Sequence, residues 1–188
     1  MIYKLSYNQK KESFFISNID TQKNYVIPKI IFSTYFDKSK IPIKVYTNIK
    51  KYAPNHKFLI FDDKEIILFF KNNYPPKVLK TFNSLHRGPH KADLFRYCYL
   101  YKFGGIYIDI KTVLIKNIEN IFNKKNVDLY TVISRNNYTI HQGVIASIPN
   151  NPLFIDLINY IINIDKPVIQ YFAFTIDFYN KLKKIYKM

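Results

Sequence analysis

Cysteine and tryptophan are the scarcest residues here: the 188-residue chain has one cysteine, Cys98, and no tryptophan. A single cysteine excludes a disulfide within the chain, which fits a reducing compartment. The first ten residues lack the apolar core of a signal peptide. No stretch reaches the roughly 20 apolar residues that a membrane-spanning helix needs. We therefore expect a cytoplasmic protein, or one peripheral at a membrane, without a transmembrane segment.

Acidic residues are also scarce, 13 against 29 basic ones, and the net charge is +16. Such an excess is typical of proteins that bind nucleic acid. The lysines are however spread along the chain instead of forming one block, as at Lys23, Lys50, Lys71, Lys102 and Lys124. A solvated basic surface is the simpler interpretation. The same surface would attract anionic ligands, nucleotide diphosphates among them.

Hydrophobic residues make up 48% of the chain, enough to build the core of one domain. Residues 1–24 have no clear periodicity and are expected to form an N-terminal extension or an edge hairpin, followed by a single domain over 25–188. The alternation of strand-like and helix-like segments in that domain predicts an α/β fold with a largely parallel sheet. Asp63 is expected to cap one helix. Strands are predicted at 25–34, 57–61, 106–110, 128–134 and 140–147, and helices at 42–52, 64–72, 88–103, 152–164 and 168–184, with a further short helical segment after Pro75-Pro76.

Glycine occurs only four times, and two glycines, Gly104 and Gly105, are adjacent. They stand between a predicted helix and a predicted strand, where glycine permits positive φ and close packing. The strand ends in Asp109. Because ligands of open α/β sheets bind beyond the carboxyl ends of the strands, Asp109 is well placed to meet a nucleotide's ribose or its metal.

The preceding helix carries two charged residues, Asp93 and Arg96, which are three positions apart and share one face. Taken alone, they would form a surface ion pair worth less than about 1 kcal/mol. Their context favours another interpretation, because the segment Ala92–Tyr97 is followed shortly by Phe103-Gly-Gly-Ile-Tyr-Ile-Asp109.

These two segments resemble the sugar-binding region of the DXD glycosyltransferases of family 32. That group includes the yeast initiating mannosyltransferase, capsular-polysaccharide enzymes and, more remotely, the clostridial glucosylating toxins. Its pattern is an Ala-Asp-x-x-Arg-Tyr helix followed by Gly-Gly-x-Tyr-x-Asp-x-Asp. The segment Ile27–Phe32 is similar to the family's opening strand. The resemblance covers residues 27 to about 155, and it implies a GT-A-type, Rossmann-like domain with a mostly parallel central sheet flanked by helices.

The resemblance also implies an activity, which is transfer of a sugar from a UDP- or GDP-linked donor to a glycan, lipid or protein acceptor with retention of configuration. Asp93 is expected to contact ribose or sugar hydroxyls, and Arg96 the sugar or the diphosphate. Asp109 is the first acid of the DXD motif and the expected metal ligand. These three are the predicted catalytic residues. The remaining donor-binding candidates are Thr34, Gly105, Tyr107, Lys111, His141 and Gln142.

The sequence departs from the family at Lys111, where the second acid of the motif is expected. In such enzymes Mn²⁺ or Mg²⁺ bridges the protein and the diphosphate. The lysine leaves three alternatives open. It neutralises the diphosphate itself, or Asp109 holds the metal with a later residue such as His141 or Asp156, or the protein is an inactive glycosyltransferase-like scaffold. A lysine that simply faces solvent is the plainest interpretation of this side chain.

Two other kinds of site fit parts of the sequence. His86, His90 and Asp93 would suit zinc if they faced one another over a helical turn, but Pro89 disfavours a continuous helix through His86. Lysines interleaved with tyrosines would suit phosphate contacts and base stacking in a nucleic-acid-binding module. The nucleic-acid interpretation predicts salt-sensitive binding and no effect of replacing Asp109.

Overall fold

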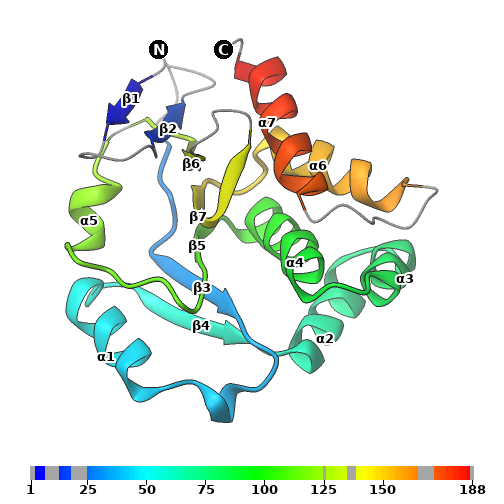
Figure 1. Cartoon of the computed structure of the whole chain (residues 1–188), viewed down its shortest axis with the longest axis horizontal. Coiled ribbons are helices and arrows are strands. Elements are labelled where there is room, and N and C mark those ends of the chain that lie inside the picture. The colour runs from blue at the N-terminus through cyan, green and yellow to red at the C-terminus, as the bar shows by residue number, and fades with distance from the viewer. Residues whose placement is uncertain are drawn as a thin grey trace.

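A single sheet of seven strands forms the centre of the computed structural model, which describes residues 3–6, 13–17, 25–124, 126–134, 139–164 and 172–186. The strand order is β1-β2-β6-β7-β5-β3-β4 (Figure 1). The strands are β1 Tyr3–Ser6, β2 Ser13–Ser17, β3 Ile30–Thr34, β4 Lys57–Phe61, β5 Gly105–Ile108, β6 Leu129–Ile133 and β7 Ile140–Ser147. The helices are η1 Lys38–Lys40, α1 Ile43–Tyr52, α2 Asp63–Asn73, α3 Pro76–Ser84, α4 Gly88–Phe103, α5 Ile118–Ile121, α6 Pro152–Ile162 and α7 Ala173–Tyr186.

The strand directions are mixed. β3 pairs in parallel with β4 and β5, whereas β7 is antiparallel to β5 and β6, and β2 is antiparallel to β6 and β1. Only β2 and β7 therefore run against the common direction. Five of the seven strands run in the same direction, which confirms the predicted α/β class with a mostly parallel sheet. β7 lies antiparallel between β5 and β6, so these two strands do not pair with each other. The hairpin β1–β2 extends the same sheet at its edge, and the division of the chain at residue 25 stays a prediction.

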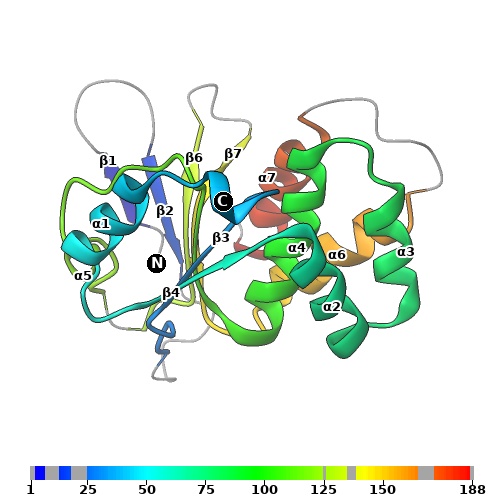
Figure 2. The same cartoon turned by 90° about the horizontal axis from the view of Figure 1, so that it is seen from below.

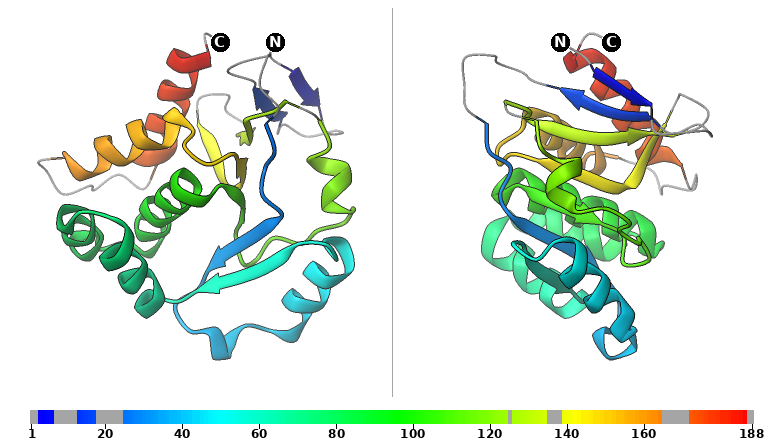
Figure 3. Two further views of the ribbon diagram at one scale, coloured as in Figure 1. Left: turned by 180° about the vertical axis from the view of Figure 1, so that it is seen from behind. Right: turned by 90° about the vertical axis from the view of Figure 1, so that its left-hand side faces the viewer.

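Helices cover both faces of the sheet (Figure 2). Neighbouring residues of a strand point to opposite faces, so Phe32 and Tyr107 face one layer while Ile31 and Ile106 face the other. The first layer holds α2, α3, α4, α6 and α7, and the second holds α1 and α5. Within the first layer α6 lies between α4 and α7 (Figure 3). No helix in the described part of the chain has the length and apolar character of a membrane span.

Helix α2 starts differently from the prediction, because its N-cap is Asp62 and not Asp63. The Asp62 carboxylate accepts a hydrogen bond from the Glu65 amide at 2.9 Å, and the Glu65 carboxylate accepts one from the Asp62 amide at 2.9 Å. This reciprocal pair is a capping box, which satisfies two amides that a helix start leaves without partners. Asp63 is the first residue of the helix.

Three other boundaries moved by a few residues. β3 begins at Ile30, five residues later than predicted, where the Ile30 amide donates to the Pro28 carbonyl at 2.8 Å in a tight turn. β5 ends at Ile108 because the Thr112 amide donates to the Asp109 carbonyl at 2.8 Å, which closes a turn. The predicted helix 168–184 begins at Ala173 in the structure, and its residues 168–171 lie outside the described part.

Candidate active site

A cavity of about 670 Å³ lies at the carboxyl ends of β3, β4 and β5. Its wall is formed by the ends of these strands, the starts of α2, α4 and α7, Ser134 after β6 and the start of β7. This is the edge of the sheet where ligands of α/β folds bind. Nearly all the predicted site residues line this one cavity: Thr34, Asp93, Arg96, Tyr107, Asp109, Lys111, His141 and Gln142.

Arg96 connects three elements around the cavity. Its Nη2 lies 3.2 Å from Asp93 Oδ1 and 3.9 Å from Asp109 Oδ1. Its Nη1 donates to the Gln142 carbonyl, and its Nε donates to the Ala92 carbonyl at 3.2 Å. The side chains of Arg96 and Asp93 are only 5% and 8% exposed, so the surface ion pair considered from the sequence is wrong. Removing one partner of a buried pair typically costs about 3–5 kcal/mol.

Tyr107 supports this arrangement from beneath. The Arg96 guanidinium lies over its ring, 4.1 Å from the centroid, and its hydroxyl donates to Asp109 Oδ1 at 2.8 Å. Tyr107 and Asp109 are two residues apart in extended chain and therefore point to the same side. Since Tyr107 is 1% exposed and Arg96 covers its ring, it offers no open face on which a nucleotide base could stack.

Gly143 brings Asp109 and His141 close together. The Asp109 amide donates to the Gly143 carbonyl at 2.9 Å. A β-carbon placed on Gly143 would lie 2.6 Å from His141 Nε2 and 2.9 Å from Asp109 Oδ2. Both atoms thus border the same point in the cavity, and they can do so because residue 143 has no side chain.

Gln142 presents a buried amide to the cavity. The residue is 7% exposed, and neither its Nε2 nor its Oε1 has a hydrogen-bond partner among the described residues. The neighbouring Tyr97 hydroxyl is buried and also lacks a described partner with hydrogen-bond geometry. An unsatisfied buried polar group costs about 1–3 kcal/mol, which the hydroxyl groups of a bound ligand would offset.

The charges of the described part of the wall are balanced. Asp63, Asp93 and Asp109 line the cavity together with three basic residues, Lys91, Arg96 and Lys111. Burial raises the pKa of Asp93 to about 6, and the negative charge of Asp109 adds to this effect, while Arg96 and His90 oppose it. Asp93 therefore exchanges its proton close to neutral pH, unlike an exposed aspartate.

Gly105 and Asp156 lie elsewhere. Gly105 is absent from the cavity wall and has φ of 107°, and a β-carbon on it would lie 2.8 Å from the Ile30 carbonyl oxygen. Glycine is therefore required there by strand packing and not by a donor. Asp156 is an exposed residue of α6, close enough to Asp177 to affect its pKa, and does not line the cavity.

The zinc site of His86, His90 and Asp93 is not formed. Within the described residues, no group of three or more His, Cys, Asp or Glu side chains is placed to hold a metal ion. The His90 ring is buried and packs on Phe174, with the ring centroids 4.8 Å apart.

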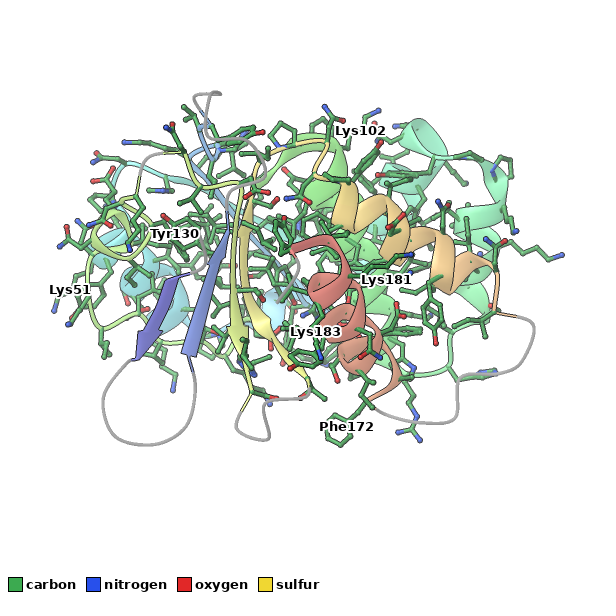
Figure 4. The ribbon with its side chains drawn as sticks, turned by 90° about the horizontal axis from the view of Figure 1, so that it is seen from above. Lys51, Lys102, Tyr130, Phe172, Lys181 and Lys183 are labelled. Atoms are coloured by element: carbon green, nitrogen blue, oxygen red, sulfur yellow. The ribbon has the colours of Figure 1, made fainter. Side chains whose placement is uncertain are left out.

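Sequence reasoning missed several residues of the wall. Phe36 and Phe172 line the cavity while remaining 63% and 59% exposed. Phe172 projects outward just before α7 (Figure 4). No motif marks these aromatics, because they reach the cavity only through the packing of α7 and of the loop after β3. Gly143 did carry a signal, since an isolated glycine inside a strand pattern suggests a close approach.

Residues 40–128 match the family described as the glycosyltransferase sugar-binding region containing the DXD motif. A glycosyltransferase of Acanthamoeba polyphaga mimivirus is 32% identical over 142 residues, which cover 69% of this chain and 53% of that protein. The initiation-specific alpha-1,6-mannosyltransferase of Saccharomyces cerevisiae is 30% identical over 119 residues, covering 58% of this chain and 25% of that protein. A mannosyl phosphorylinositol ceramide synthase of the same yeast is 27% identical over 152 residues, covering 77% of this chain and 37% of that protein.

The chain thus spans between 25% and 53% of the length of these curated relatives. Among solved structures, the PaToxG glycosyltransferase superposes with a TM-score of 0.60 at 15% identity, covering 86% of this chain and 70% of that chain. This likeness confirms the predicted GT-A-type fold. The segment that matches this family model, residues 40–128, contains Asp93, Arg96, Tyr107 and Asp109.

Proposed function

We propose that this protein transfers a sugar from a UDP- or GDP-linked donor to a glycan, lipid or protein acceptor, with retention of anomeric configuration. The observation that carries the proposal is the convergence of Asp93, Arg96 and Asp109 in one cavity at the carboxyl edge of the sheet. The family supports sugar transfer, and two of the relatives above are named for mannosyl transfer. The donor base, the sugar and the acceptor are part of the proposal.

The roles of the side chains follow from their contacts. The carboxylates of Asp93 and Asp109 are acceptors for hydroxyl groups of the donor's ribose or sugar. Arg96 holds both carboxylates at fixed positions, because it pairs with each and is itself tied to the Gln142 carbonyl. The partnerless Gln142 amide offers a donor and an acceptor to further sugar hydroxyls. Such fixed polar groups supply the positioning on which transfer reactions depend.

Enzymes with a DXD motif commonly use a divalent cation, which neutralises the diphosphate and stabilises the leaving group. The residues present fit that ion poorly. Lys111 occupies the position of the second acid, and Asp109 Oδ1 already accepts the Tyr107 hydroxyl. Asp109 Oδ2 and His141 Nε2 border one point of the cavity beside Gly143 and are the metal-binding atoms that meet there. The roles proposed above for Asp93, Arg96 and Gln142 do not depend on a metal ion.

The test is a screen of UDP- and GDP-sugars for turnover and for thermal stabilisation of the protein, with and without Mn²⁺. Asp109→Ala is expected to abolish turnover, because it removes the more exposed of the two carboxylates that pair with Arg96. Asp156→Ala is the control, since it removes an exposed acid of α6 outside the cavity and should leave turnover unchanged.

A catalytically inactive scaffold is the second candidate function, favoured by the lysine at position 111. It predicts stabilisation by a nucleotide sugar without turnover under any condition. Binding of RNA together with indifference to every nucleotide sugar would instead support the basic nucleic-acid-binding module and refute the transferase.

A further inference from the structure

We infer that the cavity binds the diphosphate of its donor without a divalent metal ion and that the Lys111 ammonium supplies the positive charge in the metal's place. This inference rests on the proposed function, because it concerns the leaving diphosphate of a nucleotide-sugar donor. It assigns a role to the residue at which this chain departs from the DXD pattern.

The described wall of the cavity offers few ligands to a metal ion. Mn²⁺ and Mg²⁺ favour several oxygen ligands in a regular arrangement. Asp93 Oδ1 pairs with Arg96, and Asp109 Oδ1 accepts the Tyr107 hydroxyl, so one oxygen of each of these two carboxylates is already engaged. One carboxylate oxygen and one imidazole nitrogen remain on the open side of Gly143. In the described part of the chain no set of three metal-binding side chains comes together.

Lys111 lies in a turn at the wall of the cavity. The turn closed by the bond from the Thr112 amide to the Asp109 carbonyl places Lys111 at its third residue. The side chain lines the cavity and is exposed, and no carboxylate of the described residues lies within ion-pair distance of it. Its charge is therefore available to a ligand, and it also repels a cation bound at Asp109.

Among the described residues of the wall, the other two cations already have contacts. Arg96 is 4% exposed and is tied to Asp93 and to the Gln142 carbonyl. The Lys91 ammonium lies over the Phe82 ring, 5.1 Å from its centroid. Among the basic residues in the described wall, Lys111 is thus the best placed to contact phosphate oxygens.

The bonds and the proton of the transfer are all accounted for without a metal ion. The bond between C1 of the sugar and the diphosphate oxygen breaks, and its electron pair stays with the diphosphate. The acceptor oxygen bonds to C1, and its proton goes to the diphosphate. The ammonium of Lys111 offsets the negative charge that develops on the leaving oxygen, as fixed cations do in phosphate-binding sites.

Calorimetric titration of UDP and GDP tests the inference on the whole chain. For whichever nucleotide binds, the wild type is expected to show the same Kd in EDTA as in Mn²⁺. Lys111→Ala should weaken binding about tenfold or more, because a charge-assisted contact is lost. Lys111→Asp recreates the two acids of the motif, so it should lose binding in EDTA and regain it with Mn²⁺.

Lys57→Asp is the matched control, because it makes the same charge change at the amino end of β4, on the opposite edge of the sheet. It should leave the Kd unchanged. Electron paramagnetic resonance of Mn²⁺ gives a second readout: the wild-type complex should take up no more ion than the free nucleotide does.

Wild-type binding that disappears in EDTA would overturn the inference and leave the glycosyltransferase proposal intact. So would a tightly bound Mn²⁺ whose signal is lost in His141→Ala, since the ion would then use the two remaining donors. If neither nucleotide nor any nucleotide sugar binds under either condition, both the inference and the proposed function fail.

Discussion

Single atoms decide the geometry of the cavity, and Gly143 illustrates this best. The His141 and Asp109 side chains fill the space where a β-carbon of residue 143 would lie, so the shape of the site requires glycine at this position. The sequence predicted that Asp93, Arg96 and Asp109 are functional, because they belong to a recognisable motif. It could not predict that Asp93 and Arg96 are buried, since spacing shows only that they share a helix face.

Gly143→Ala is expected to impair the site without unfolding the protein. The new methyl group must displace the His141 ring or the Asp109 carboxylate, both of which end flexible or exposed side chains. Because small misplacements of reacting groups are costly, turnover should fall about 10- to 100-fold. The measurement is kcat with the donor that the screen identifies, alongside the melting temperature.

Asp156→Ala provides the comparison, because this exposed acid of α6 lies outside the cavity. It should retain near wild-type turnover. A Gly143→Ala variant with full activity would show that the positions of His141 and Asp109 are not critical.

Among the elements, helix α2 shows how a boundary is set by a cap. Its predicted extent was nearly right because Pro75 and the apolar pattern are local signals. Its capping residue was assigned one position too late. Asp62 and Asp63 have the same side chain, and only the extended backbone at Asp62, with ψ of 174°, directs that carboxylate onto the Glu65 amide.

Asp62→Ala should therefore destabilise the protein by about 1 kcal/mol, the usual value of an N-cap. The reason is that the Glu65 amide loses its acceptor, whereas the backbone amide of residue 62 keeps the Glu65 carboxylate as its partner. Urea denaturation measures the change in the free energy of unfolding. Lys64→Ala is the matched substitution in the same turn, exposed and outside the capping box, and is expected to change stability by less than about 0.5 kcal/mol. Equal losses for both would argue against the cap.

On the scale of the whole molecule, the packing of α7 on α6 buries an acid that no local pattern marks. Asp177 is half-buried, and its Oδ2 has no hydrogen-bond partner in the part of the chain that the structure describes. Burial raises the pKa of Asp177 to about 6, Lys181 opposes the shift, and Asp156 reinforces it. The folded state therefore holds this proton more tightly than the unfolded state, whose value is near 3.8.

The consequence is a pH-dependent stability with a defined sign. Between about pH 4 and pH 6 the folded state binds more protons, so the contribution of Asp177 to stability falls as the pH rises through this window. Asp177→Asn should remove that part of the slope and raise stability at pH 7, by about 1 kcal/mol or less after solvent screening. Melting temperatures of both proteins across this pH range measure the effect. Parallel curves would contradict it.

The surface charge is also a property of the whole molecule. Lys51, Lys102, Lys181 and Lys183 lie on α1, α4 and α7, at separate places on the surface (Figure 4). This agrees with the interpretation of the lysines as a scattered, solvated surface.

The sequence by itself determined the α/β class, most of the helices and strands, and the segment that carries the site, because hydrophobic period, glycine and proline signals and the motif are all local. The tertiary structure alone decided that Asp93 and Arg96 are buried and that the Tyr107 hydroxyl donates to Asp109. It also decided that His141 and Asp109 meet beside Gly143. These contacts join α4, β5 and β7, which are far apart in the chain. They exist only once the sheet has formed, because pairing and packing between distant segments depend on the whole fold.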